Sequence, residues 1–245
     1  MDGKHIVVQK PRKSGSTFYT YKHTFALQLL ALVNADYQFL YVDVGCQGRI
    51  GDAGVYYHSG LSKALINNTI NIPAAKKLPQ SEVVCRYMLV ADEAFPLTPY
   101  MMKPYAKRGL NSSEKVFNYR LSRARRVIEN SFGILAHWFR VFLAPICLST
   151  KSVTALVLAA VTLHNFLRSR SASREVYCSD AAVDRKNTTT GEVISGEWRL
   201  ANVSRGMVDM MPLRGNLRSD GKEMRDKLAE YFVADGAVPW QWVHG

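Results

Sequence analysis

The sequence predicts an α/β fold in which a β-sheet is flanked by helices. Strands are indicated by two runs rich in β-branched and aromatic residues, Thr17–Val33 and Tyr37–Val44, and by a short apolar run, Tyr87–Ala91. A long helix is indicated between Ser113 and Trp138, where apolar residues recur at steps of three and four. With 47% apolar residues in 245, the chain can build a core, which excludes a wholly disordered or collagen-like protein.

The first two runs are expected to pair as antiparallel strands. Asn34 and Asp36 separate them, and both residue types favour tight turns. Glycine then recurs at every third position from Gly45 to Gly54, too densely for the interior of a helix or strand, which predicts a loop. From Val55 to Ile66 the pattern becomes helical again.

The run Tyr87–Ala91 has the composition of a strand buried on both faces. Asp92 and Glu93 follow it directly. A carboxylate placed immediately after such a strand lies at the sheet edge where ligands of open α/β sheets usually bind. We therefore interpret Asp92 as a candidate site residue, with a simple strand-end cap as the alternative.

The helix from Ser113 to Trp138, capped by Ser112 or Ser113, has a strongly basic polar side. Its charged residues there are Lys115, Arg120, Arg123, Arg125, Arg126 and the single acid Glu129. The arginines are expected either to contact DNA phosphates or simply to form a solvated face, and their spread around the helix means that not all can touch one ligand. A second helix is predicted over Ser152–Arg168.

The last third of the chain is more polar. Residues 170–216 have the composition of a linker or mobile loop, and residues 217–245 are expected to form a helix, Asp220–Phe232, followed by an aromatic tail that docks on the body. Trp240 and Trp242 in that tail are interpreted as packing residues, with base stacking as the alternative.

The net charge of +12 is concentrated in residues 1–170, which hold 22 basic and 9 acidic residues. Such an excess favours a polyanionic partner, most often nucleic acid.

The apolar stretch Val153–Leu163 is about half of the ~20 residues that a membrane span needs, and nothing resembles a secretory signal. Four widely separated cysteines without a Cys-x-x-Cys pair argue against a disulfide framework and a structural zinc. We expect a reduced, intracellular protein without a membrane segment.

Three acids are candidates for metal binding: Asp2, Asp92 and Glu129. Two strand carboxylates and one helix carboxylate are what a two-cation site requires, because Mg²⁺ prefers oxygen ligands and two such ions can promote phosphodiester cleavage. Asp2 could instead be only a terminal acid, and Glu129 could pair with Arg125 or Arg126 on its own helix.

Five motifs occur in an order that resembles one family. They are DGKHI at 2–6, DVGCQGR at 43–49 with Asp52 after it, ADEAFPL at 91–97, FNYRLSRAR at 117–125 running into ENSFGIL at 129–135, and LHNFL at 163–167. Together they resemble the DDE endonuclease domain of PIF/Harbinger-type transposases and of the host proteins derived from them. The resemblance covers at least residues 2–169, and we take residues 1–169 as the nuclease domain.

The resemblance implies an RNase H-like mixed β-sheet flanked by helices, a Mg²⁺- or Mn²⁺-dependent DNA endonuclease and a nuclear location. The family's three metal-binding acids match Asp2, Asp92 and Glu129, and 36 residues separate the last two. Asp52 matches an acid that recurs after the glycine loop, and we assign it a supporting role. His164 is expected to be a structural histidine, and His5 is ambiguous with a structural role favoured.

One departure from the family pattern affects the expected activity. In the family a strand leads into the first Asp and a helical region, often a helix-turn-helix, precedes the nuclease core, whereas here Met1 directly precedes Asp2. We therefore expect that the chain either is truncated or has lost its DNA-targeting part, with an incomplete first strand, a loosely held Asp2 and a separate DNA-targeting partner protein. The alternative function is a catalytically inactive, domesticated DNA-binding or protein-interaction module. The sequence leaves the oligomeric state open.

Overall fold

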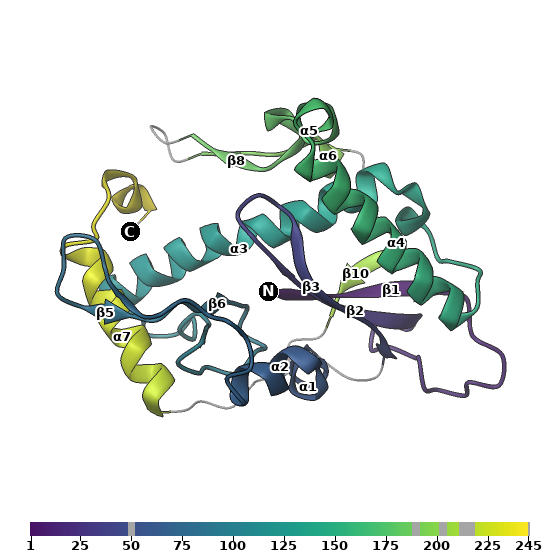
Figure 1. Ribbon diagram of the computed structural model, residues 1–245, viewed down its shortest axis with the longest axis horizontal. Helices are drawn as coiled ribbons and strands as arrows, with labels where there is room; N and C mark the ends of the chain where they lie inside the picture. Colours follow the sequence, from purple (N-terminus) through teal and green to yellow (C-terminus); the bar gives the residue numbers. More distant parts are fainter. Residues whose placement is uncertain (49–51, 188–191, 201–204, 211–218, 245) are drawn as a thin grey trace.

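The computed structural model describes residues 1–48, 52–187, 192–200, 205–210 and 219–244. Figure 1 shows a central sheet crossed by the long helix α3 (Ser112–Trp138), with α4 (Thr150–Ser169) against one face of the sheet and the short helices α1 (Asp52–His58) and α2 (Gly60–Ile66) on the other side. The amino terminus lies near the centre of the molecule, next to α3 (Figure 1). The α/β class predicted from the sequence is confirmed.

The main sheet has four strands among the described residues, in the order β10-β1-β2-β3. They are β1 (Asp2–Val8), β2 (Phe25–Val33), β3 (Phe39–Gln47) and β10 (Met207–Asp209). All three pairings are antiparallel, whereas a mixed sheet was expected. A parallel pairing of two short strands lies outside this sheet, between β6 (Leu89–Val90) and β7 (Met101–Met102).

The predicted hairpin forms between β2 and β3. Asn34 fixes its turn, because its side-chain oxygen accepts hydrogen bonds from the backbone N–H groups of Asp36 (3.0 Å) and Gln38 (2.9 Å). Two predicted boundaries differ from the structure. The first strand begins only at Phe25, and β3 continues to Gln47 through Gly45, whose φ of 120° is a conformation that glycine adopts without steric cost.

The helix predicted over Val55–Ile66 is interrupted at Ser59. The side chain of Ser59 accepts a hydrogen bond from the backbone N–H of Ser62, which caps α2 and separates it from α1. Tyr56 and Leu65 from these helices pack with Leu30 of β2 and with Phe95, so they cover the sheet face opposite α3 and α4. Asp52 begins α1, and its side chain lies outside the described part of the structure.

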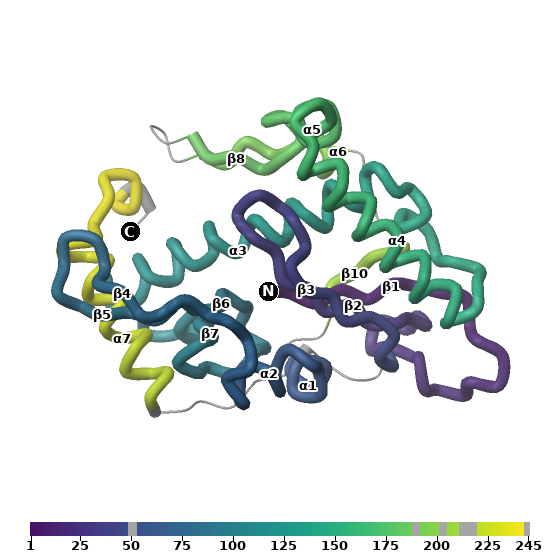
Figure 2. Tube along the Cα trace, in the orientation of Figure 1, coloured from purple at the N-terminus to yellow at the C-terminus, as the bar shows by residue number. Residues whose placement is uncertain are grey.

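The predicted strand Tyr87–Ala91 is shorter and less central than expected. Only Leu89 and Val90 form β6, both half-buried, and they pair with β7 rather than joining the main sheet. Two further short strands, β4 (Lys76–Lys77) and β5 (Val84–Cys85), form an antiparallel pair near α7 (Figure 2). Even so, Asp92 follows β6 as predicted, and β6 lies beside the start of β1.

Both long helices predicted from apolar spacing are present. The N-cap of α3 is Asn111 instead of a serine, and Asn111 and Glu114 form a reciprocal capping box. The main core lies between the sheet and these helices, where Ile128 and Phe132 of α3 and Val153 of α4 pack against Leu29.

By length and composition alone, α4 could span a membrane, with a mean hydropathy of 1.2. Its inner face packs against the core through Val153 and Val157, and Asn165 bonds both the N–H and the C=O of Phe39 on β3 at 2.8 Å. A helix that covers a sheet can have the same apolar composition. Length and mean hydropathy alone are therefore weak evidence for a membrane segment. The absence of a membrane segment therefore stays an expectation.

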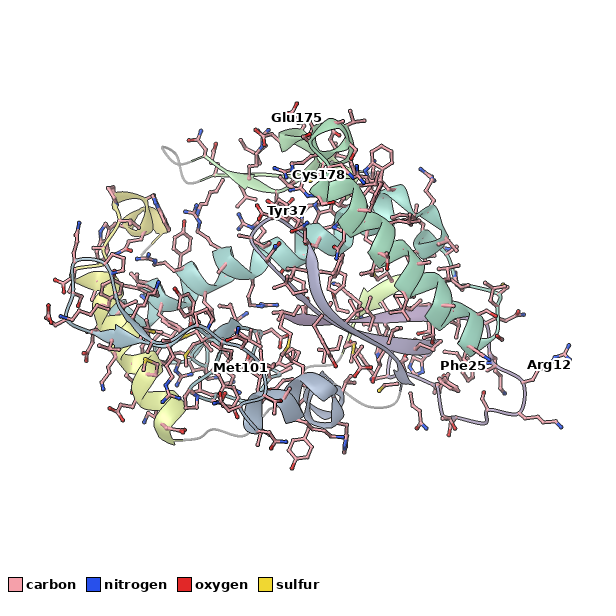
Figure 3. The ribbon with its side chains drawn as sticks, in the orientation of Figure 1. Arg12, Phe25, Tyr37, Met101, Glu175 and Cys178 are labelled. Atoms are coloured by element: carbon pink, nitrogen blue, oxygen red, sulfur yellow. The ribbon has the colours of Figure 1, made fainter. Side chains whose placement is uncertain are left out.

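The stretch 170–216 contains ordered elements, in contrast to the linker expected from its composition. They are α5 (Ser171–Tyr177), the 3₁₀ turn Asp180–Ala182, the hairpin strands β8 (Arg185–Lys186) and β9 (Val193–Ile194), α6 (Glu197–Leu200) and the edge strand β10. Tyr177 and Cys178 pack beside Tyr37 of the β2–β3 turn. Figure 3 labels Cys178 and Tyr37, which lie near each other. Residues 188–191 of this stretch lie outside the described part of the chain.

The expected carboxyl-terminal helix and docked tail are also found. Helix α7 (Ser219–Val233) packs along α3, where Phe232 stacks with Phe117, and a 3₁₀ helix follows at Pro239–His244. A further 3₁₀ turn, Arg140–Leu143, follows α3. The tail therefore docks at the amino-terminal half of α3, far along the chain from its own position.

Candidate active site

The three predicted metal-binding acids line one cavity of about 540 Å³. They come from three separate elements: Asp2 from β1, Asp92 from the turn after β6, and Glu129 from α3. Basic side chains share the same walls. These are Lys4, Lys22, Arg125 and Arg199. The fold thus brings together residues that the sequence places more than 125 positions apart.

Asp2 is held firmly, contrary to the loosely held position that was expected. Its residue is only 7% exposed, it pairs with Ala31 in the β1–β2 register, and its Oδ1 accepts a hydrogen bond from the N–H of Gly3 at 2.9 Å. The amino group of Met1 donates a hydrogen bond of 2.6 Å to the carbonyl oxygen of Val90. This contact ties the start of β1 to β6, the strand that leads to Asp92.

Asp92 is electrostatically coupled to Asp2. Burial raises the pKa of the Asp92 carboxyl, and the negative charge of Asp2 raises this pKa further. The Arg125 guanidinium and the N–H of Ala94, which donates to Asp92 Oδ1 at 2.9 Å, act in the opposite direction. Two carboxylates that repel each other inside a cavity lose that repulsion when a cation binds between them.

Glu129 faces the same cavity but pairs with a residue that the sequence reasoning missed. Its Oε2 atom lies 3.8 Å from Nη2 of Arg199 on α6. The predicted alternative, an ion pair with Arg125 or Arg126 on α3, is not formed among the described residues. Because Arg199 lies 70 positions further along the chain, in a stretch that resembles a linker, no local pattern indicated this contact.

Arg199 is itself fixed by Asp184. Nε and Nη2 of Arg199 lie 2.5–2.8 Å from the two Asp184 carboxylate oxygens, and the Asp184 side chain is fully buried. Hydrogen bonds from Arg199 and from the N–H of Gly196 lower the pKa of Asp184 despite its burial. Asp184 therefore stays ionised and holds the guanidinium in place.

Asn130 fastens this pair to α3. Its side-chain oxygen accepts hydrogen bonds from the N–H of Asp184 (3.0 Å) and from Nε1 of Trp198 (3.1 Å), and its amide donates to the Asp184 carbonyl (3.3 Å). The Trp198 ring lies against Gly133. Thus the residue directly after Glu129 anchors the segment that carries Arg199.

The predicted DNA-contacting arginines separate into two groups. Arg120 donates hydrogen bonds to Gly236 O (2.6 Å) and Gln241, and its guanidinium carbon lies 4.0 Å from the Phe232 ring centroid. Arg123 lies 3.8 Å over the Trp240 ring. Both hold the carboxyl-terminal tail, as the docking prediction for Trp240 requires.

The other two arginines have different surroundings. Arg125 lines the acid-containing cavity, and Arg126 is close enough to Asp184 to lower its pKa. Trp242 is half-exposed, so its packing role is less complete than that of Trp240. Arg125 therefore faces the cavity, whereas Arg120 and Arg123 contact the tail.

Both histidines singled out in the sequence are buried. His164 lies 2.8 Å from the Tyr177 hydroxyl and 2.8 Å from the Tyr37 carbonyl, so Nε2 donates to the carbonyl and Nδ1 accepts from the hydroxyl. Burial lowers the pKa of His164 to about 4. His5 is also buried, on the α1–α2 face of the sheet, with its pKa lowered to about 4, so neither histidine reaches the acids.

The donor set fits a hard divalent cation in its chemistry. Asp2 and Asp92 are neighbouring carboxylates whose repulsion a cation would relieve, and Glu129 adds a third oxygen ligand on the same cavity. As the side chains stand, no three His, Cys, Asp or Glu residues of the described part are gathered into a ready ligand set. Glu129 would need to turn from Arg199 toward the two aspartates.

The fold and the acid-lined cavity define a nuclease-like α/β domain, and the chain belongs to the DDE superfamily endonucleases, whose family pattern matches residues 1–165. It is 27% identical to the Arabidopsis thaliana protein called "Protein ALP1-like" over 171 residues, which cover 68% of this chain and 42% of that protein. The chain thus spans less than half the length of this relative. No solved structure matches it.

Proposed function

We propose that this chain is the catalytic domain of a divalent-metal-dependent DNA endonuclease of transposase descent. The observation that carries the proposal is that Asp2, Asp92 and Glu129, from three elements, line one cavity in a chain of the DDE superfamily. The reaction would be phosphodiester hydrolysis or strand transfer, with water or a 3′-hydroxyl as nucleophile and no covalent protein intermediate.

The three acids would hold Mg²⁺ or Mn²⁺. Two such ions supply the activation of the attacking oxygen and the stabilisation of the leaving oxygen. The chain's own contribution is to hold Asp2 and Asp92 side by side through the Met1–Val90 contact and the β1–β2 pairing. Arg125 offsets part of their charge, so the metal-free fold tolerates the two carboxylates.

DNA is the proposed substrate, and the nucleus is the proposed location. The charge of residues 1–170 supports a polyanionic ligand, and Lys4, Lys22 and Arg125 place part of that charge at the cavity itself. Recognition of a particular DNA sequence would come from a separate targeting protein, because phosphate contacts position a protein on DNA without reading its sequence.

The test combines metal binding and nicking in matched variants. Asp92→Asn and Glu129→Gln should abolish Mn²⁺-dependent nicking of supercoiled plasmid DNA while DNA affinity stays within a few-fold of the parent. The control is Glu114→Gln, the same substitution on the same helix at a position outside the cavity, where Gln also supports a capping box.

A second readout does not depend on turnover. Removing the charge of Asp92 relieves its repulsion with Asp2, so Asp92→Asn should raise the melting temperature of the metal-free chain and lose the further rise that Mn²⁺ gives the parent. If the parent binds DNA tightly but shows neither nicking nor stabilisation by Mn²⁺, the proposal of a metal-dependent endonuclease is wrong. The pairing of Glu129 with Arg199 favours the alternative in that case, a non-catalytic DNA-binding or interaction module.

A further inference from the structure

We propose that Arg199 is a phosphate-binding residue of this cavity, whose guanidinium donates hydrogen bonds to a phosphodiester of a bound DNA strand. The assignment rests on the proposed function in one respect, that the ligand is DNA. Arg199 lies outside residues 1–165, over which the chain matches its family. Its role therefore has to be argued from its surroundings.

The first argument is its position. Arg199 lines the cavity together with Asp2 and Asp92, and its Nη2 lies 3.8 Å from Glu129. Its side chain is 43% exposed, so it remains accessible from the cavity although its inner edge is buried against Asp184. A cation placed beside a metal-binding carboxylate is adjacent to the position that a reacting phosphate would occupy.

The second argument is preorganisation. Asp184 takes Nε and Nη2 of Arg199, whereas no hydrogen bond of Nη1 is formed within the described part of the chain. An arginine presents five donors in a rigid fork that matches phosphate oxygens, so a guanidinium held along one edge can offer its other edge to a ligand. Less side-chain entropy is then lost when the ligand binds.

The third argument is the construction behind the pair. A purely structural ion pair needs only Asp184 and Arg199, yet Trp198 is also held by Asn130, and the Arg199 guanidinium carbon lies 4.4 Å from the Trp198 ring centroid. Asn130 follows Glu129 directly on α3. The network therefore fixes Arg199 relative to the same turn of helix that carries a metal-binding acid.

The test measures whether Arg199 senses the charge of one phosphate. The probe is the dinucleotide dTpdT, whose single phosphodiester allows only one binding register, and its uncharged methylphosphonate analogue. Titrations by NMR or calorimetry in Ca²⁺ and in EDTA avoid any need for cleavage. Arg199→Gln should bind dTpdT about tenfold more weakly than the parent, since hydrogen bonds to charged groups are strong.

The decisive result is the coupling between the two changes. Neutralising the phosphate should weaken binding to the parent by about tenfold and binding to Arg199→Gln by a clearly smaller factor, with a coupling of about threefold or more. Arg185→Gln is the matched control, because Arg185 is an exposed arginine of the same segment that does not line the cavity. For this control the two losses should simply multiply.

Several outcomes overturn the assignment. They are parent-like dTpdT affinity in Arg199→Gln, losses that multiply without coupling, and no binding of dTpdT by the parent in either buffer. If Arg199→Gln does not fold because Asp184 loses its partner, the double variant Asp184→Asn/Arg199→Gln removes both charges and takes its place in the cycle.

The plasmid-nicking assay separates this proposal from the proposed function. If the parent nicks DNA with Mn²⁺ and the coupling is absent, the nuclease stands and the role of Arg199 fails. If the coupling is present and the parent never nicks DNA, Arg199 binds phosphate in a protein that is not a nuclease.

Discussion

The indole ring of Trp198 occupies the space in which a side chain at position 133 would lie. Gly133 is on α3, one helical turn after Glu129, and Trp198 precedes Arg199 on α6. A glycine in the middle of a helix costs about 1 kcal/mol relative to alanine. The absence of a side chain at position 133 allows α6 to approach α3 closely enough for Arg199 to reach Glu129.

Gly133→Ala should therefore destabilise the protein in spite of its better helix propensity. The added methyl group would collide with the Trp198 ring, and overpacking of this kind typically costs about 1–3 kcal/mol. Urea denaturation measures the change. Because Trp198→Ala removes the collision, the double variant should lose less stability than the sum of the two single changes, and a fully additive result would contradict the contact.

Arg120→Ala should reduce stability without reducing DNA binding. Arg120 loses its bonds to Gly236 and Gln241 and its stacking on Phe232, which together predict a loss of about 1–3 kcal/mol in the free energy of unfolding. Because its guanidinium donates hydrogen bonds to the carboxyl-terminal tail, we do not expect it to contact DNA. The slope of log K against log salt for DNA binding should be the same as in the parent. A less steep slope would show that Arg120 contacts DNA.

Arg125→Ala should have the opposite profile. Arg125 lines the cavity and lowers the pKa of Asp92, so its loss should raise that pKa further. If Arg125 contacts one phosphate, the slope of log K against log salt should become less steep by about 0.9. Filter binding or fluorescence anisotropy at several salt concentrations measures the slope, with Arg120→Ala as the control on the same helix. An unchanged slope would remove Arg125 from the DNA contacts.

Stability should fall in mild acid because of His164. Its pKa is about 4 in the folded protein, where burial and the positive charge of Arg168 disfavour protonation, against 6.5 for an ordinary histidine. The folded state thus binds fewer protons. The contribution of His164 is complete above about pH 6.5, declines as the pH falls toward 4, and amounts to about 3 kcal/mol over that window.

The comparison for this pH effect is His164→Gln. The variant should be less stable at pH 7 but should lose less stability than the parent between pH 6.5 and 4, as measured by urea denaturation. The buried His5 contributes in the same direction in both proteins, so it cancels in the comparison. Parallel pH profiles for the two proteins would show that His164 is not the titrating group.

The sequence by itself determined the local elements and nominated the acids of the candidate site. Apolar spacing located α3 and α4, the Asn34 turn located the β2–β3 hairpin, and the motif order predicted Asp2, Asp92 and Glu129 as site acids, which line one cavity. These elements can be recognised from the sequence because a helix face, a hairpin and a turn each depend on residues that are close in the chain. The acids were recognisable only because their neighbours resemble a family.

The tertiary structure decided which side chains meet across the chain. The Met1–Val90 contact helps to hold the buried Asp2 in place. Arg120 contacts the carboxyl-terminal tail, whereas Arg125 lines the cavity. Arg199 lies next to Glu129. The segment that carries Arg199 resembles a linker because Asp184 bonds Arg199 and Asn130, which are distant in the sequence, and these contacts leave no local periodicity. Composition reports polarity, but only packing shows whether a polar group faces water or another side chain.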